Sequence, residues 1–351
     1  MKKLSLICLS ALLALSMSAC KKEAPKMESE APEVLSSSQV GSVETPTEKS
    51  SAPAESPSTP AQSMRIASLK GPTGLGMLPM LEEAKPDYEF TILGSPDEIA
   101  PLFLGDKADL ISVPANLAAN LYTKTKGETQ VLCINTLGML SVLERGDSIK
   151  TIGDLKGRTI YSSGKGASPE IMLNFLLEKN GLDSSKDLEI VYKAQHEECL
   201  AALLSDPEGV AVLPEPFASA ATLKDSTLRY ALSFNDEWSR VDSASLPVTG
   251  VIIAKKSYLA SHKEEVKAFL ADYAASALFM NKADDEACAL AEKYKICPAP
   301  VAKAAIPRCA IKIVEGSDMK NLLDPYIKVL FDSLPASIGG ELPKDDFYYI
   351  P

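Results

Sequence analysis

From Met64 onwards, short apolar runs alternate with stretches in which apolar residues recur at helical spacing. Short runs separated by Gly- and Pro-containing turns predict strands that alternate with helices, the pattern of parallel βαβ units. The predicted strands are residues 64–70, 88–95, 108–114, 131–138, 139–145, 158–164, 188–194, 209–216, 228–234 and 247–259. Beyond residue 260 the pattern is almost entirely helical, over residues 262–283, 284–296, 299–309 and 318–334. The chain is therefore predicted to be an α/β protein.

The first twenty residues have the pattern of an export signal. A basic start at residues 1–3 precedes an apolar run at 4–15 and small residues before Cys20. The run is shorter than the roughly 20 residues that a membrane-spanning helix needs. Small residues directly before a Cys resemble the bacterial lipobox, although Met17 departs from its usual aliphatic position. This resemblance implies a signal peptide over residues 1–19 and a lipid on Cys20, and an ordinary secretory signal with an incidental Cys is the alternative.

Residues 20–63 are expected to connect that lipid to a folded body. The segment is rich in Ser, Pro, Glu, Ala and Thr, with almost no aromatic residues and no apolar periodicity. Such a composition does not bury enough apolar surface to offset the entropy of ordering, so the segment is predicted to be a disordered, semi-extended linker.

Composition sets limits on the body, residues 64–351, which is long enough for one large or two medium domains. The formal net charge of the chain is -11. Nucleic-acid binding needs a clustered basic surface, and nothing in this composition favours one. Seven Cys are present, and five remain beyond Cys20, an odd number that leaves at least one free thiol. Cys199 and Cys288 are expected to be buried as small hydrophobes. A bridge of Cys297 to either Cys288 or Cys309 stays open.

Signatures of catalysis and metal binding are weak. The only histidines, His196 and His262, are too few for a Cys/His zinc site, and both lie in polar helical surroundings that predict a surface position. The GxSxG and P-loop patterns are absent. No metal, no cofactor and no catalytic residue is expected, and the chain is not predicted to be an enzyme.

Five stretches, taken in order, resemble the extracytoplasmic solute-binding proteins of ABC importers, in the branch that binds nitrate, sulfonates, taurine and thiamine precursors. They are residues 70–74 (KGPTG), 108–122 (ADLISVPANLAANLY), 148–170 (SIKTIGDLKGRTIYSSGKGASPE), 209–221 (GVAVLPEPFASAA) and 250–273 (GVIIAKKSYLASHKEEVKAFLADY). Each motif alone is weak, but together they cover nearly the whole body.

The resemblance implies a type II periplasmic-binding-protein fold with two lobes, each a mainly parallel sheet flanked by helices. Lobe one is expected at residues 64–150 plus 251–351 and lobe two at 151–250, with a hinge of two strands near 140–145 and 249–254. It further implies a monomer that binds a small molecule between the lobes and delivers it to ABC permease subunits. The protein is expected in the periplasm or on the outer face of the cytoplasmic membrane, held by its lipid anchor.

Candidate ligand contacts follow from the rule that open parallel sheets bind ligands beyond the carboxyl ends of their strands. Gly residues there permit close backbone approach, helix N-termini favour acceptor oxygens, and hydroxyl and amide groups add polar contacts. The predicted contacts are Lys70, Gly71, Pro72, Thr73, Gly74, Pro114, Asn116, Asn135, Thr136, Ser162, Ser163, Gly164, Gly166, Ser168, Glu215 and Thr249. Ser168, followed by Pro169 and an acid, is also predicted as a helix N-cap.

Some assignments stay open at this stage. Lys165 is interpreted as a solvated turn residue or a ligand contact, Glu215 as a ligand contact or a strand-end cap, and Trp238 as a stacking platform for a flat ligand or a packing residue. The ligand is either a small organic anion or a heteroaromatic vitamin precursor, although the loops carry no Arg to favour a sulfonate. Two other functions are weighed: an enzyme similar to the pyrimidine synthases of thiamine metabolism, and a surface sensor or adhesin.

Overall fold

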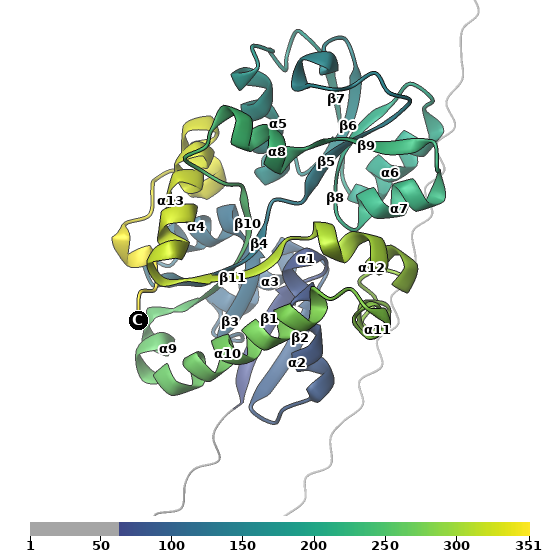
Figure 1. Cartoon of the computed structure of the whole chain (residues 1–351). Helices are drawn as coiled ribbons and strands as arrows, with labels where there is room; N and C mark the ends of the chain where they lie inside the picture. Colours follow the sequence, from purple (N-terminus) through teal and green to yellow (C-terminus); the bar gives the residue numbers. More distant parts are fainter. Residues whose placement is uncertain (1–62) are drawn as a thin grey trace, which may run out of the picture. The chain divides into compact units, whose positions relative to one another are not determined.

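The structure, a computed structural model, describes residues 63–351. The predicted signal peptide, the lipidation of Cys20 and the linker up to residue 62 lie outside the described residues. Within the described part, the strands form two mixed sheets that are flanked by helices (Figure 1). Among the helices of residues 63–351, none combines the length and the apolar character needed to cross a membrane.

The first sheet has six strands. Their order across the sheet is β11 (Ile311–Glu315), β4 (Thr129–Leu137), β10 (Val248–Lys255), β3 (Leu110–Pro114), β1 (Met64–Leu69) and β2 (Tyr88–Leu93). β1 runs parallel to β2 and β3, whereas β10 is antiparallel to β3 and β4, and β11 is antiparallel to β4. The first seven residues of β10 are buried, because this strand lies inside the sheet and is covered on both faces.

The second sheet has five strands. Their order is β7 (Glu189–Lys193), β6 (Thr159–Ser163), β8 (Val210–Pro214), β5 (Leu140–Arg145) and β9 (Leu228–Ser233). β6 runs parallel to β7 and β8, and β5 is antiparallel to β8 and β9. The predicted two-lobed fold with flanking helices is thus present, but both sheets are mixed rather than mainly parallel. Two of the antiparallel strands, β5 and β10, directly follow the points where the chain passes between the sheets, and the third, β11, is an edge strand of the first sheet.

Helices cover both sheets (Figure 1). Those that follow strands of the first sheet are α1 (Pro72–Leu75), α2 (Leu78–Glu83), α3 (Pro96–Leu104), α4 (Ala115–Lys124), α9 (Lys256–Ser261), α10 (Lys263–Met280), α11 (Asp285–Lys293), α12 (Ala299–Ala305) and α13 (Gly316–Ser333). Those of the second sheet are α5 (Ser168–Lys179), α6 (His196–Ser205), α7 (Phe217–Lys224) and α8 (Phe234–Val241). Short 3₁₀ turns are η1 (Ile152–Leu155), η2 (Ile306–Arg308), η3 (Pro335–Ile338) and η4 (Asp345–Phe347).

The boundary between the lobes differs from the predicted one at residue 150. β5 pairs with β8 and β9, so residues 140–145 belong to the second sheet. The chain enters that sheet through Gly138 and Met139 and returns to the first sheet between α8 and β10. The two strands predicted to form the hinge therefore lie in different sheets, and the crossings are the short segments next to them. The Nδ2 group of Asn235 donates to the carbonyl of Gly138 at 2.8 Å and braces the first crossing.

One strand was missed by the pattern of apolar residues. β11, with the sequence IKIVE, lies between η2 and α13, in the gap between the predicted helices 299–309 and 318–334, where no strand was predicted. It is a five-residue edge strand in which only Ile311 is fully buried. So short an element, exposed along one side, leaves too little alternation in the sequence to separate it from the helices on either side.

Trp238 is a packing residue. Its ring is 0% exposed and stacks on Phe175 with 4.2 Å between centroids. The indole Nε1 donates to the hydroxyl of Ser245 at 2.9 Å, which satisfies its one polar atom. Because α8 turns this face towards α5, the side chain is part of the core, and the hypothesis that it stacks on a ligand is wrong.

All five cysteines of the described part are free thiols. Cys199 and Cys288 are buried, as predicted, and neither of the bridges considered for Cys297 is formed. Burial raises the pKa of Cys297 to about 11, so even this partly exposed thiol is protonated at neutral pH.

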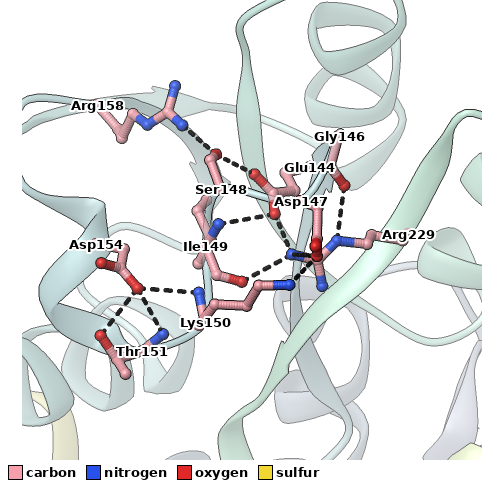
Figure 2. Close-up of polar contacts among 10 residues, drawn as sticks. All are labelled: Glu144, Gly146, Asp147, Ser148, Ile149, Lys150, Thr151, Asp154, Arg158 and Arg229. Atoms are coloured by element: carbon pink, nitrogen blue, oxygen red, sulfur yellow. Dashed lines mark hydrogen bonds and ion pairs between the residues drawn. The ribbon is translucent and has the colours of Figure 1, made fainter.

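A polar network closes the edge of the second sheet where β5 ends and β6 begins (Figure 2). Glu144, whose side chain is 2% exposed, accepts hydrogen bonds from Ser148 Oγ at 2.6 Å and from the Ile149 N–H at 2.9 Å. Arg229 on β9 also donates to this carboxylate, and Arg158 donates to Ser148. The buried carboxylate therefore holds the turn between β5 and η1. This turn lies where the parallel strands β6 and β8 begin, on the side of the sheet opposite to their carboxyl ends.

Candidate ligand-binding site

A cavity of about 290 Å³ lies where strands of both sheets end. Its lining comprises Pro96, Pro114, Asn116, Met139, Leu140, Ser163, Gly164, Ala167, Ser168, Pro169, Met172, Ala194, Gln195, His196, Pro214 and Thr249. The parallel strands β3, β6 and β8 reach it with their carboxyl ends, and the antiparallel β5 and β10 reach it with their first residues. This is the edge at which open α/β sheets bind ligands, so we take this cleft cavity as the candidate site.

In the second sheet, Ser163 at the end of β6 meets His196 at the start of α6. Ser163 Oγ lies 2.5 Å from Nδ1 of His196, and the imidazole packs 5.2 Å from the ring of Phe217. Burial lowers the pKa of His196, and the nearby Glu197 opposes this only in part. The imidazole is therefore neutral at pH 7, and with Nδ1 engaged by Ser163, Nε2 is the ring nitrogen left for a ligand.

His196 corrects the prediction that both histidines lie on the surface. A strand end places it in the cavity, because α6 begins only three residues after β7 ends at Lys193. His262 is partly exposed and does not line the cleft cavity, and its ring stacks on Tyr258, 4.1 Å between centroids, at the end of α9.

A hydrogen bond between α4 and α5 joins the two sides of the cavity. Ser168 Oγ donates to Oδ1 of Asn116 at 3.0 Å. Ser168 is the first residue of α5 and Ala167 is the N-cap, so the prediction of Ser168 as N-cap is wrong by one residue. The turn is made by Gly164 and Gly166, with φ of 71° and 78°, which places Ala167 in the extended conformation and leaves the hydroxyl of Ser168 free to reach Asn116.

Six of the sixteen predicted contacts line this cavity: Pro114, Asn116, Ser163, Gly164, Ser168 and Thr249. The others do not: Lys70, Gly71, Pro72, Thr73, Gly74, Asn135, Thr136, Ser162, Gly166 and Glu215. A buried network in the first sheet occupies several of them. Asn135 Nδ2 donates to Ser112 Oγ at 2.7 Å and to the Thr73 carbonyl at 3.1 Å. Their contact with a ligand stays a prediction, and the proposals below rest on the residues that line the cavity.

Glu215 lies behind the cavity in a polar cluster of its own. Its side chain accepts from the hydroxyl of Tyr230 at 2.7 Å and from the N–H of Ser219 at 3.1 Å, and the residue is 1% exposed. Burial raises the pKa of Glu215, while the hydrogen bonds from Tyr230 and Ser219 and the charge of Arg308 oppose the shift. The contacts support the strand-end interpretation, in which Glu215 caps the first turn of α7.

Lys165 does not line the cavity. Its ammonium lies 5.6 Å from the centre of the Tyr192 ring, and the residue is exposed. This position agrees with the interpretation of Lys165 as a solvated turn residue.

Several lining residues were not predicted, and they fall into two groups. Gln195 and His196 directly follow the predicted strand at 188–194, so the strand-end rule would have included them had it been applied to that strand. Met139 and Met172 carry no polar signal, and only the three-dimensional arrangement places their side chains in the lining.

Comparison with known proteins places this geometry in a known fold. Residues 129–287 match the family model described as NMT1/THI5 like. No curated protein sequence matches the chain. Among solved structures, one of an ABC transporter from Parabacteroides distasonis is 23% identical, covering 82% of this chain and 98% of that one, with a TM-score of 0.70.

Two further structures have the same fold. The periplasmic aliphatic sulphonate binding protein of Escherichia coli is 18% identical, covering 84% of this chain and 93% of that one, with a TM-score of 0.67. The ligand binding component of an ABC-type import system from Staphylococcus aureus, with zinc bound, is 15% identical, covering 82% and 97%, with a TM-score of 0.61. The chain therefore has the fold of type II periplasmic binding proteins. Within residues 63–351, no group of three or more His, Cys, Asp or Glu side chains is placed to hold a metal ion.

Proposed function

We propose that the chain is the solute-binding component of an ABC import system, which binds a small solute in the cleft cavity and delivers it to membrane permease subunits. The observation that carries this proposal is that residues of both sheets line one cavity at the ends of their strands. A solute held there contacts both lobes at once, so binding favours their closed arrangement over an open one. The NMT1/THI5-like match and the named structural neighbours support the same function.

The proposal includes the anchor. The leader, Cys20 and the Pro- and Ser-rich residues 20–63 have the composition of a lipidated, tethered start. A lipid on Cys20 would hold the binding body on the outer side of the membrane, close to the permease.

Thermal denaturation of the purified mature protein with pools of metabolites tests the binding function. A ligand that binds only the native state raises its stability by about 2.7 kcal/mol at 100 times its Kd. We expect one pool to raise the Tm of the unaltered protein and to have little effect on the His196→Ala variant. His262→Ala is the matched control, because it removes the other imidazole of the chain outside the cavity. The proposal fails if no pool raises the Tm, or if both variants respond like the unaltered protein.

One observation favours a second candidate, a hydrolase. Ser163 Oγ and His196 Nδ1 are within hydrogen-bonding distance, as a nucleophile and its base would be. We favour binding because no acidic side chain lines the cavity to orient the imidazole. Hydrolysis of p-nitrophenyl acetate that is faster than that of the Ser163→Ala variant would support the hydrolase.

A further inference from the structure

We propose that the cleft cavity selects an uncharged solute with a mostly apolar body and one or two hydrogen-bond acceptors. This inference rests on the proposed binding function and specifies the class of solute. It sets the chain apart from the structural neighbour that is named for aliphatic sulphonate binding.

The first observation is the lining itself. None of the residues that line the cavity is an Asp, Glu, Lys or Arg. Met139, Leu140 and Met172, together with prolines and alanines, make most of the wall. Moving an ion out of water into such surroundings costs several kcal/mol unless a partner charge is present, whereas an apolar body gains free energy from the same transfer. The wall therefore favours a neutral solute.

The second observation concerns the two helices that begin at the cavity, α5 and α6. A helix N-terminus attracts anions, but both of these N-termini already have a carboxylate of their own. Glu170 accepts from the N–H of Gly166 at 2.5 Å, and Glu198 accepts from the N–H of Ala194 at 3.2 Å. Glu170 and Glu198 do not line the cavity, but their charges oppose the helix dipoles that would otherwise favour an anion there.

The third observation is the set of polar atoms left for a ligand. The hydroxyls of Ser163, Ser168 and Thr249 already bond to His196, to Asn116 Oδ1 and to the Leu137 carbonyl, the last at 2.7 Å. Among the hydrogen bonds of residues 63–351, none uses Asn116 Nδ2, His196 Nε2 or the side-chain amide of Gln195, which also lines the cavity. Two side-chain amides and an imidazole nitrogen suit a carbonyl oxygen or a ring nitrogen, but without a positive charge they do not replace the hydration of a sulfonate.

The volume limits the size of the solute. About 290 Å³ is just below the range for ligand pockets, which is roughly 300–1,000 Å³. A single ring with a carbonyl or amide substituent fits that description.

Near-isosteric probes of different charge test this inference. Benzamide, benzoate and benzamidine have nearly the same shape and are neutral, anionic and cationic at pH 7.5, and butyramide, butyrate and butylammonium form an aliphatic series. We expect the neutral member of at least one series to bind the mature protein about tenfold more tightly than either charged member, a difference of about 1.4 kcal/mol, in titration calorimetry or thermal shift. The affinity of the neutral member for the protein should not change with salt concentration.

The Asn116→Asp variant makes the test specific to the cavity. Aspartate keeps the oxygen that accepts from Ser168 but replaces the Nδ2 donor by a negative charge, so we expect weaker benzamide binding and a preference for benzamidine. His262→Ala should keep the selectivity of the unaltered protein.

The two proposals fail on different outcomes. Tightest binding of a charged member, lost in Asn116→Ala, overturns the neutral-solute inference and leaves the binding function intact. No response to either series also overturns the inference. If the metabolite pools give no response as well, the binding function fails with it.

Discussion

Replacement of Glu144 should destabilise the second sheet in a way that depends on pH. The carboxylate lies at the end of β5, is 2% exposed, and accepts from Ser148, the Ile149 N–H and Arg229 (Figure 2). Glu144→Ala removes all three bonds and leaves the guanidinium of Arg229 without its most buried partner. Glu144→Gln keeps the shape of the side chain and removes only the charge.

The size of the expected loss in unfolding free energy depends on how exposed Glu144 and Arg229 are. Breaking a buried ion pair by removal of one member costs about 3–5 kcal/mol. The Arg229 side chain is 31% exposed, so water can solvate part of its charge, and we expect a smaller loss than this range, about 2–3 kcal/mol, for Glu144→Ala. At about 2 °C per kcal/mol for a large domain, this corresponds to a fall in Tm of roughly 4–6 °C. Glu144→Gln should lose about half as much.

The pH dependence has a definite sign. Burial alone would raise the pKa of Glu144, but the hydrogen bonds from Ser148 and Ile149 and the charge of Arg229 outweigh it, so the net shift is downward. A carboxyl group with a lowered pKa in the folded state contributes stability above its unfolded pKa, about 4.3, and loses it as the pH falls towards the folded value. The gap in Tm between the unaltered protein and Glu144→Gln should therefore be constant from pH 8 to about pH 5 and shrink below that.

Circular dichroism melts at a series of pH values measure both effects. Glu208→Gln is the matched control: its carboxylate is 90% exposed and 3.9 Å from Arg158, so its loss should change stability by less than about 0.5 kcal/mol at every pH. An equal Tm for Glu144→Gln and the unaltered protein at pH 7, or a gap that does not change on acidification, would refute the reasoning.

Four further predictions concern other parts of the chain. Trp238→Phe should lose about 1 kcal/mol, the value of the hydrogen bond to Ser245, and Trp238→Ala about 3–5 kcal/mol in urea unfolding, and the Phe variant should keep its ligand affinity. Arg308→Gln should cost about 0.5–1 kcal/mol by chemical denaturation, because the guanidinium lies 4.0 Å from the centre of the Tyr230 ring at an exposed site. Of the five thiols beyond Cys20, only Cys297 should react with a thiol reagent in the native protein, whereas all five should react in denaturant; rapid native labelling of Cys133 would contradict the burial. Cys20→Ala should move the protein from the membrane fraction to the soluble fraction without a change in ligand affinity, and continued membrane association would exclude lipidation as the anchor.

The order of strands and helices was readable from the sequence because buried strands and amphipathic helices differ in apolar period. The strand β8, VAVLP, is buried at every position and stands out as an apolar run. The edge strand β11 is too short and too exposed to do so. The spacing of apolar residues within a strand does not show which sheet the strand joins. β5 was expected in the first lobe, but it pairs with β8 and β9, which lie about 70–90 residues further along the chain.

The site was predictable only in part, for a related physical reason. Strand ends identify loops that face the cleft, and this rule selected Pro114, Asn116, Ser163 and Ser168, which line the candidate cavity. It also selected Asn135 and Thr73, which bond to their neighbours and do not line the candidate cavity, and their contact with a ligand stays a prediction. A sequence does not distinguish a polar side chain that awaits a ligand from one already bonded to its neighbours.

The character of the site depends on pairings that only the folded chain reveals. The Gly- and Ser-rich loop before α5 taken alone favours an anion, since free N–H groups at a helix start attract negative charge. In the folded protein Glu170 accepts from the N–H of Gly166 in that loop, Glu198 does the same before α6, and the hydroxyls of Ser163 and Ser168 are engaged. Only the polar groups that are not used in these internal bonds are left to bind a solute. Those groups suit a neutral hydrogen-bond acceptor better than the anion that the loop sequence alone suggests.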